Sequence, residues 1–248
     1  MSEVIAFVSG PGGTGKTTCC AGIAMALAAR GEKVLCIDLD IGLGGLDQAL
    51  GMAEMASLSV LDVSEGGHPL QKAERHPEHA MLQLLTAPLN CRPDQLSGEA
   101  FEKLMEKARK HYDFVFLDAP AGLDHGFRLA TREADRCLLV TVAEPAALRG
   151  SCRTAQQLQL MGKPARLVVD RIRPKQARLL GLTVDDVMDQ VGLPLLGIVA
   201  EDENIPLAVR HGLSVTELCK KKGAAAAFDR MAQRIQGLPV GIPLKEFK

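Results

Sequence analysis

The sequence predicts an α/β protein with three layers, in which a doubly wound, mostly parallel sheet is covered by helices on both faces. Two observations carry this prediction. Short apolar runs alternate with helix-like segments along the chain, and several runs are apolar at every position, as in strands buried on both faces. With 248 residues and 47% hydrophobic content the chain can bury a full core, so residues 1–248 are interpreted as a single domain.

About seven strands are expected, each a short run of mainly β-branched or large apolar residues. The runs are residues 4–8, 34–37, 81–85, 114–117, 137–140, 166–169 and 195–199. The helices expected between them are residues 18–29, 100–110, 149–161, 184–191, 206–211 and 224–235. Two prolines and two glycines interrupt residues 237–248, which are expected to form an irregular tail. Ligands on such sheets bind beyond the carboxyl ends of the strands, so functional residues are expected there.

Composition narrows the class of protein. Lys and Arg number 29 against 30 Asp and Glu, and aromatic residues are scarce, so a nucleic-acid partner is not expected. The sequence starts without a signal-peptide pattern and contains no run of about eighteen apolar residues, which predicts a cytoplasmic protein. The seven cysteines form no C-x-x-C pair and are expected to be reduced and mostly buried.

Two further clusters are interpreted as ordinary surface. The segment at residues 76–79, His-Pro-Glu-His, carries metal-ligand residue types, but Pro77 disfavours a regular helix there and a solvated loop is expected. The lysine run at residues 220–222 is expected to be a solvated patch.

Residues 10–17 read Gly-Pro-Gly-Gly-Thr-Gly-Lys-Thr, between an expected strand and an expected helix. In that context the pattern G-x-x-x-x-G-K-[ST] predicts a phosphate-binding loop, because glycines let successive amides point at phosphate oxygens and the helix N-terminus adds positive potential. Lys16 is expected to be a catalytic residue that binds the β- and γ-phosphates. The Thr17 hydroxyl is expected to bind Mg²⁺. Phosphate contacts are assigned to Gly12, Gly13, Thr14, Gly15, Lys16, Thr17 and Thr18.

Aspartates follow two of the expected strands. Asp118 is expected to hold Mg²⁺ through its water shell, and Asp40 to orient the attacking water as the second catalytic residue, supported by Asp38. The alternative is that these are surface aspartates that cap turns. Pro120 and Gly122 follow Asp118, and this loop could approach the γ-phosphate; together with the three aspartates it is assigned to a nucleotide-sensitive switch.

The motifs at residues 9–18, 38–43 and 118–124 resemble the MinD/ParA family of deviant Walker A proteins, and the resemblance extends from about residue 4 to 218. It implies a P-loop NTPase fold of the SIMIBI type and ATP, with Mg²⁺, as the cofactor. Weaker matches at residues 168–175 and 197–202 correspond to the segments that hold adenine in the family. The resemblance thus assigns adenine contacts to Asp170, Arg171, Glu201 and Asp202. It also implies an ATP-dependent homodimer, a protein partner such as a division inhibitor, inner-membrane attachment and resetting by hydrolysis.

The chain departs from the family pattern at several positions. Pro11 replaces a lysine that reaches the partner's nucleotide, and a cation acting in trans can be worth roughly 10³–10⁵ in rate. Gly150 stands where the family usually has aspartate, although Glu144 matches. Asp170 replaces an asparagine, which keeps an acceptor for adenine but loses a donor. The tail lacks a basic amphipathic helix, so no autonomous membrane anchor is expected.

These features predict an ATP-dependent regulatory switch in division-site selection or spatial positioning, with weak or partner-dependent hydrolysis. The alternatives are a non-hydrolysing, nucleotide-sensing scaffold and a ParA-like partitioning protein; the balanced charge disfavours the latter. Arg128 and Arg149 are candidates for a substitute cation, against the simpler interpretation as surface arginines. The protein is expected in the cytoplasm, and at the inner membrane when a partner recruits it.

Overall fold

The computed structural model describes residues 2–219 and 223–244, and its strands form one sheet of eight in the order β3-β4-β2-β5-β1-β6-β7-β8. Every neighbouring pair is parallel except β3 and β4. The strands are β1 (Glu3–Val8), β2 (Val34–Asp38), β3 (Glu74–Arg75), β4 (Leu82–Leu85), β5 (Phe114–Asp118), β6 (Arg136–Val142), β7 (Ala165–Ile172) and β8 (Leu195–Ala200). The expected doubly wound sheet is therefore confirmed; the antiparallel β3, at two residues, is too short to be seen as an apolar run.

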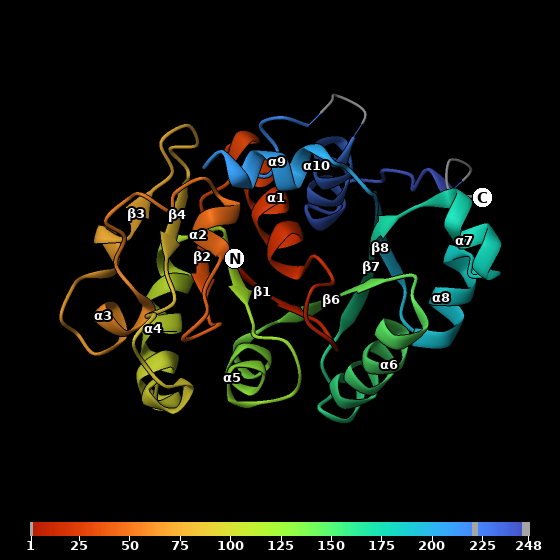
Figure 1. Cartoon of the computed structure of the whole chain (residues 1–248). Helices are drawn as coiled ribbons and strands as arrows, with labels where there is room; N and C mark the ends of the chain where they lie inside the picture. Colours follow the sequence, from red (N-terminus) through yellow and green to blue (C-terminus); the bar gives the residue numbers. More distant parts are fainter. Residues whose placement is uncertain (1, 220–222, 245–248) are drawn as a thin grey trace.

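Helices cover both faces of the sheet, which confirms the three-layer prediction. In Figure 1 the helices α4, α5 and α6 lie on one side of the strands, and α1 and α10 lie on the other. The helices are α1 (Lys16–Ala29), α2 (Leu46–Ala49), α3 (Val60–Ser64), α4 (Gly98–His111), α5 (His125–Glu133), α6 (Pro145–Leu160), α7 (Pro174–Leu180), α8 (Val184–Val191), α9 (Asn204–Arg210) and α10 (Ala224–Ile235), with short 3-10 turns at Leu70–Lys72 and Pro93–Gln95. Each face of the sheet has its own apolar core, with Phe101 and Phe127 on one face and Phe228 on the other.

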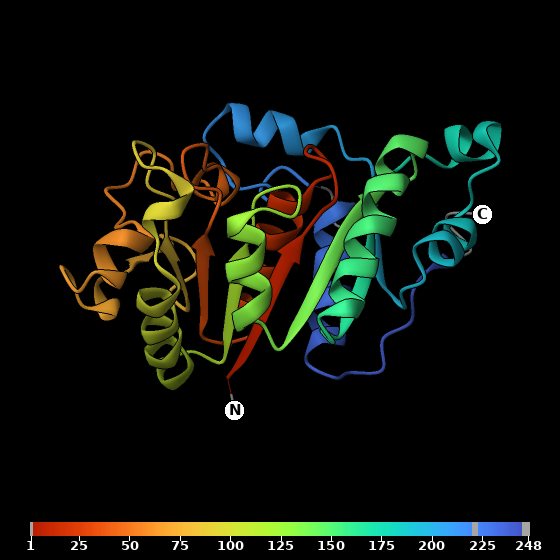
Figure 2. The ribbon, with the colours of Figure 1, turned by 90° about the horizontal axis from the view of Figure 1, so that it is seen from below.

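Some helices differ from expectation. The helices α2, α3, α5 and α7 were not expected. Helices α2 and α3, with four and five residues, are too short to show a helical period, whereas the apolar face of α5, with Phe127 and Ala130 buried, was a signal that the sequence analysis missed. Helix α6 begins at Pro145 rather than at residue 149, since proline is well suited to the first turn, where its missing N–H is not needed. In Figure 2 the strands rise from the N-terminus at the lower edge to an upper edge where α9 lies.

The last described residues, 237–244, lie against the body of the protein. Residues 237–243 form neither helix nor strand, and Ile242 and Leu244 pack against the core. The Arg234 guanidinium donates to the Val240 carbonyl at 2.7 Å and so holds the segment to α10. Residues 245–248, and the lysine run at 220–222, lie outside the described part of the chain. Within the described part, no helix is long and apolar enough to cross a membrane.

The expectation of a solvated loop at residues 76–79 holds for Pro77 and Glu78 but is wrong for His76, which is 4% exposed. Its Nδ1 accepts the backbone N–H groups of Glu78 and His79 at 3.1 and 3.2 Å, and its Nε2 lies 2.9 Å from the Leu50 carbonyl. An Nδ1 that accepts two hydrogen bonds requires the neutral ring with its proton on Nε2. His76 is therefore a structural residue, and within the described residues no group of three or more potential ligands forms a metal site.

We expect His76 to make the fold less stable in mild acid. Burial lowers the pKa of His76 below its ordinary 6.5, so the unfolded chain takes up the proton first as pH falls. The contribution of neutral His76 to the free energy of unfolding is thus fully present above pH 6.5 and is lost as the pH falls below it. Denaturant unfolding at pH 7.5 and 5.5 should show that wild type loses up to about 1 kcal/mol more than His76→Gln does over this interval. His79→Gln is the matched control, and an equal loss in H76Q and wild type would contradict the assignment.

Candidate nucleotide-binding site

The glycine-rich loop joins β1 to α1 at the carboxyl edge of the sheet. Gly13 and Gly15 have φ angles of 75° and 86°, a region that side chains rarely adopt, so glycine is needed at both positions. Gly15 caps α1 and Lys16 is the first residue of that helix. The free amides at this N-terminus form the kind of anion site that the motif predicts. The hydroxyl of Thr14 is buried without a hydrogen-bond partner among the described residues, and a phosphate oxygen in the loop would supply one.

Lys16, Thr17 and Asp118 meet beneath the loop. The Lys16 ammonium lies 2.6 Å from Asp118 Oδ1, and the Thr17 hydroxyl donates to Asp118 Oδ2 at 2.7 Å. Lys16 and Asp118 are both buried. Burial by itself would lower the pKa of Lys16, but the Asp118 carboxylate outweighs it and holds the pKa above the ordinary 10.5. The lysine is therefore charged and is directed at the carboxylate.

The two aspartates after β2 occupy different positions. Asp38 is buried, and its carboxylate accepts the backbone N–H groups of Asp40 at 2.9 Å and Leu46 at 3.0 Å. Burial, reinforced by the neighbouring Asp118 carboxylate, raises the pKa of Asp38 to about 7. Asp38 thus shapes the loop between β2 and α2 from below. Asp40 is half-buried and lines a nucleotide-sized cavity above the glycine loop, where an attacking water would have to be held.

A cavity of about 780 Å³ opens above the glycine loop and extends toward α9. Its lining includes all seven residues assigned to phosphate and all four assigned to adenine. Asp38, Asp118, Pro120 and Gly122 are absent from the lining. Asp118 contacts Lys16 and Thr17 instead, and Gly122 N donates to the Ser9 carbonyl at 3.3 Å, which ties its loop to the glycine loop.

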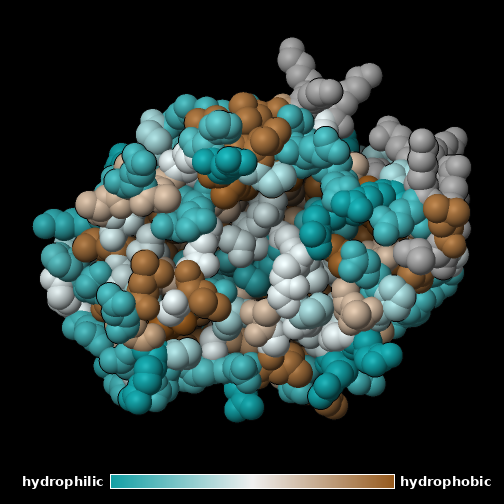
Figure 3. Space-filling view, in the orientation of Figure 1, coloured by the Kyte–Doolittle hydropathy of each residue, from teal (hydrophilic) through white to brown (hydrophobic). Residues whose placement is uncertain are grey.

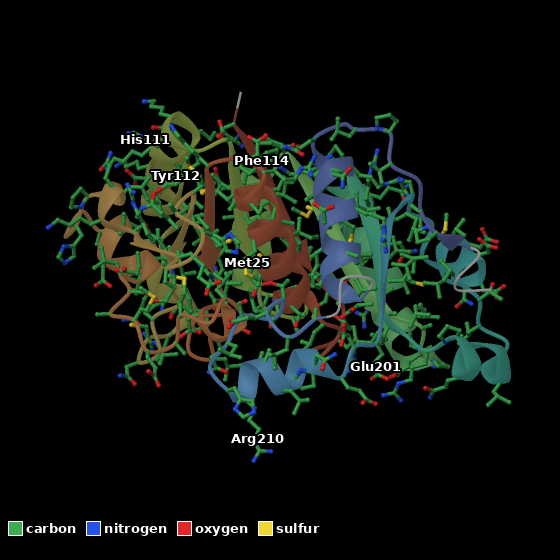
Figure 4. The ribbon with its side chains drawn as sticks, turned by 90° about the horizontal axis from the view of Figure 1, so that it is seen from above. Met25, His111, Tyr112, Phe114, Glu201 and Arg210 are labelled. Carbon is green, nitrogen blue, oxygen red and sulfur yellow. The ribbon has the colours of Figure 1, made fainter. Side chains whose placement is uncertain are left out.

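Several lining residues were not predicted. Ser9, Ala121 and Arg173 lie close in the chain to predicted residues, and α9 with the turn before it supplies a whole wall. The wall residues are Glu203, Ile205, Pro206, Val209 and Arg210, and Ala200 at the end of β8 adjoins them. Their position after the carboxyl end of β8 is the signal that could have found them. Figure 4 shows that Glu201 and Arg210 both lie at this edge, apart from each other, while Phe114, at the start of β5, lies at the opposite edge.

The far end of the cavity is built from β7 and β8. Asp170 is 3% exposed, and Arg171, with φ of 50°, reaches back to donate to the Gly13 carbonyl at 2.6 Å. Glu201 is ion-paired with Arg173. Asp202 accepts the backbone N–H groups of Asn204 and Ala224, at 3.1 and 3.3 Å, and so braces α9 and α10. Of the four predicted adenine residues, Asp170 is the one whose carboxyl is not committed to an ion pair or a brace.

Helix α6 packs directly on the glycine loop. A Cβ on Gly10 would come within 2.3 Å of the Gly150 carbonyl carbon, and a Cβ on Gly150 within 2.8 Å of Pro11 Cδ. The proline ring and the glycine at 150 are therefore matched in shape. Neither candidate cation lines the nucleotide cavity: Arg149 lines a separate cavity between α6 and α8, and Arg128 lies exposed on α5.

Comparisons with known proteins identify the relatives of this chain. A family model described as an AAA domain matches residues 2–167. The septum site-determining protein MinD of Synechocystis is 34% identical over all of this chain and 93% of its own length. The MinC:MinD cell division protein complex of Aquifex aeolicus matches at 32% identity and a TM-score of 0.88, covering 97% of this chain and 98% of that one.

A further solved structure, the septum site-determining protein MinD of Pyrococcus horikoshii complexed with Mg-ADP, matches at 25% identity and a TM-score of 0.83, covering 95% of this chain and 96% of that chain. Identity, coverage and fold agree over nearly the full length of the protein. The chain belongs to the MinD family of septum site-determining proteins.

Proposed function

We propose that this chain is a MinD-type ATPase that uses ATP binding and slow or partner-dependent hydrolysis as a switch in division-site placement. The observation that carries the proposal is the buried contact of Lys16 and Thr17 with Asp118, directly beneath a glycine loop that opens into a nucleotide-sized cavity. The same proposal places the chain in the cytoplasm, and at the inner membrane when a partner recruits it.

Each residue has a distinct role in this proposal. Lys16 leaves Asp118 to bind the β- and γ-phosphates, while the loop amides of residues 12–18 hold the remaining oxygens. Thr17 would bind Mg²⁺ and Asp118 would steady the ion through water; the ion would neutralise phosphate charge. Asp40 orients the attacking water, and Asp38 holds the Asp40 backbone in place by the 2.9 Å hydrogen bond. Pro120 and Gly122 lie in the loop that couples Asp118 to the glycine loop.

The proposal includes an ATP-dependent homodimer that presents the carboxyl edge of the sheet to its partner copy. Leu43, after β2, is 80% exposed and Leu89, after β4, is 65% exposed. A Cβ on Gly44 would lie 3.3 Å from a Leu89 methyl group, so the two leucines belong to neighbouring loops. Figure 3 shows apolar side chains gathered to the left of a pale centre on this face. We expect the dimer to bind a protein partner of the kind seen in the MinC:MinD complex.

Solution mass and phosphate release test the proposal together. With ATP and Mg²⁺ the purified chain should form a dimer that ADP does not support, and Asp40→Ala should keep the dimer while phosphate release falls further. Asp47→Ala, an aspartate of the same segment outside the cavity lining, is the matched control. ATP binding with a monomer throughout, and no phosphate release, would instead favour the nucleotide-sensing scaffold.

A further inference from the structure

Asp170 occupies an unusual position at the end of β7. Its side chain is buried, yet it lines the nucleotide cavity. It lies so close to the glycine loop that a Cβ on Gly15 would come within 1.7 Å of its Oδ2. The carboxyl group is therefore held in place between the loop and the part of the cavity that extends toward α9, where the base of a bound nucleotide would lie.

The two charged groups that act on the Asp170 carboxyl, Arg171 and Glu201, have partners elsewhere. The Arg171 guanidinium donates to the Gly13 carbonyl, and Glu201 is paired with Arg173. Cys19, which faces Asp170 from α1, is a neutral thiol because burial raises its pKa well above 9.0. The Arg171 backbone N–H is near enough to the Asp170 carboxyl to oppose the effect of burial on its pKa. The carboxyl lines the cavity and is thus available to a ligand.

The burial of Asp170 changes its charge state near neutral pH. Burial raises the pKa of Asp170 to about 7, against the opposing effect of the Arg171 N–H and guanidinium and with a small contribution from Glu201. Below pH 7 the neutral acid predominates in the folded protein. A neutral carboxyl group has one O–H donor and a carbonyl acceptor, whereas the ionised group only accepts.

Adenine presents a matching pair on one edge, the N6 amino group as donor and N7 as acceptor, and side-chain amides bind this edge through two hydrogen bonds. A neutral carboxyl group offers the same acceptor and donor. An ionised carboxylate would still accept from N6 but would face the N7 lone pair. Guanine presents two acceptors, O6 and N7, on the same edge and matches only the donor.

We propose that Asp170 reads the base as a neutral carboxyl group, which accepts a hydrogen bond from adenine N6 and donates its proton to N7 in a second hydrogen bond. The inference rests on the proposed nucleotide site and adds its base-reading group. Above pH 7 a proton must be taken up when nucleotide binds, so affinity should fall with rising pH, approaching tenfold per pH unit.

The test measures the dissociation constant of Mg-ADP, a probe that avoids turnover, for wild type and Asp170→Asn between pH 6 and 8. The amide has the donor and acceptor of the neutral acid at every pH. The ratio of the wild-type constant to that of D170N should therefore rise about tenfold from pH 6 to pH 8. Other groups that titrate in this range, Asp38 among them, affect both proteins and cancel in the ratio.

A second measurement uses wild type alone and so does not depend on the folding of a variant. It compares ADP with 7-deaza-ADP, in which a C–H replaces the N7 acceptor. Wild type should prefer ADP at pH 6 and lose most of that preference by pH 8. Parallel pH profiles in the two proteins, or a preference that does not change with pH, would overturn the inference alone. Absence of nucleotide binding at every pH would overturn the proposed function as well.

Discussion

Lys16→Ala is expected to weaken binding of ATP with Mg²⁺ by more than about a hundredfold, because the lysine is the one cation of the loop that reaches the β- and γ-phosphates. The same substitution should lower the free energy of unfolding of the nucleotide-free protein by about 3–5 kcal/mol, since Asp118, 1% exposed, would lose its 2.6 Å partner and remain buried. Calorimetric titration with ATP and denaturant unfolding measure the two effects separately.

Asp118→Asn is the matched control for that prediction. The amide keeps an oxygen for the Thr17 hydroxyl but no longer holds the Lys16 ammonium by charge. Without Mg²⁺, in the presence of a chelator, this variant should bind ATP more tightly than wild type, because Lys16 is already free for phosphate. With Mg²⁺ its hydrolysis should be lower. If D118N and K16A weakened magnesium-free binding equally, the ion pair would not be competing with nucleotide.

Pro11→Lys is expected to raise the rate of ATP hydrolysis by at least about tenfold, and by up to about 10³ if the new ammonium reaches the partner's nucleotide as a trans cation does. The substitution is compatible with the site, because Pro11 is exposed enough for a long side chain to leave the loop and Gly150 imposes no side chain beside it. Phosphate release at dimer-forming concentrations of protein is the measurement.

Pro11→Ala separates charge from shape in that experiment. It removes the ring that packs on Gly150 and restores a backbone N–H, but adds no cation. The alanine variant should hydrolyse ATP at close to the wild-type rate. Equal acceleration by alanine and lysine would show that loop flexibility, rather than a missing cation, limits the reaction.

The parts of the site that are contiguous in the chain could be predicted from residue types alone. The glycine loop, Lys16 and Thr17 follow from one motif, and its place between β1 and α1 follows from the apolar run before it and the helix formers after it. Asp38, Asp40 and Asp118 could be proposed because the carboxyl ends of parallel strands share one edge of the sheet. Both inferences need only local sequence and the general rules of parallel sheets.

Contacts between distant segments could not be predicted in this way. The sequence did not indicate that α9 forms a wall of the cavity or that His76 is buried beneath the Leu50 carbonyl, because each depends on a neighbour far along the chain. The different roles of Asp38 and Asp40 could not be predicted either. They depend on which of the two carboxylates accepts hydrogen bonds from the backbone of the loop, and the structure shows that this is Asp38.

By itself the sequence determined the class of fold, the phosphate loop and the absence of a cation at position 11, since strand burial, glycine geometry and side-chain charge are properties of residues in short segments. Only the tertiary structure decided which groups are charged and which are free. It buries Asp170 against Gly15, and it pairs Lys16 with a carboxylate about a hundred residues away. The physical reason is that solvation and electrostatic interaction depend on distance in space, which packing sets and chain order does not.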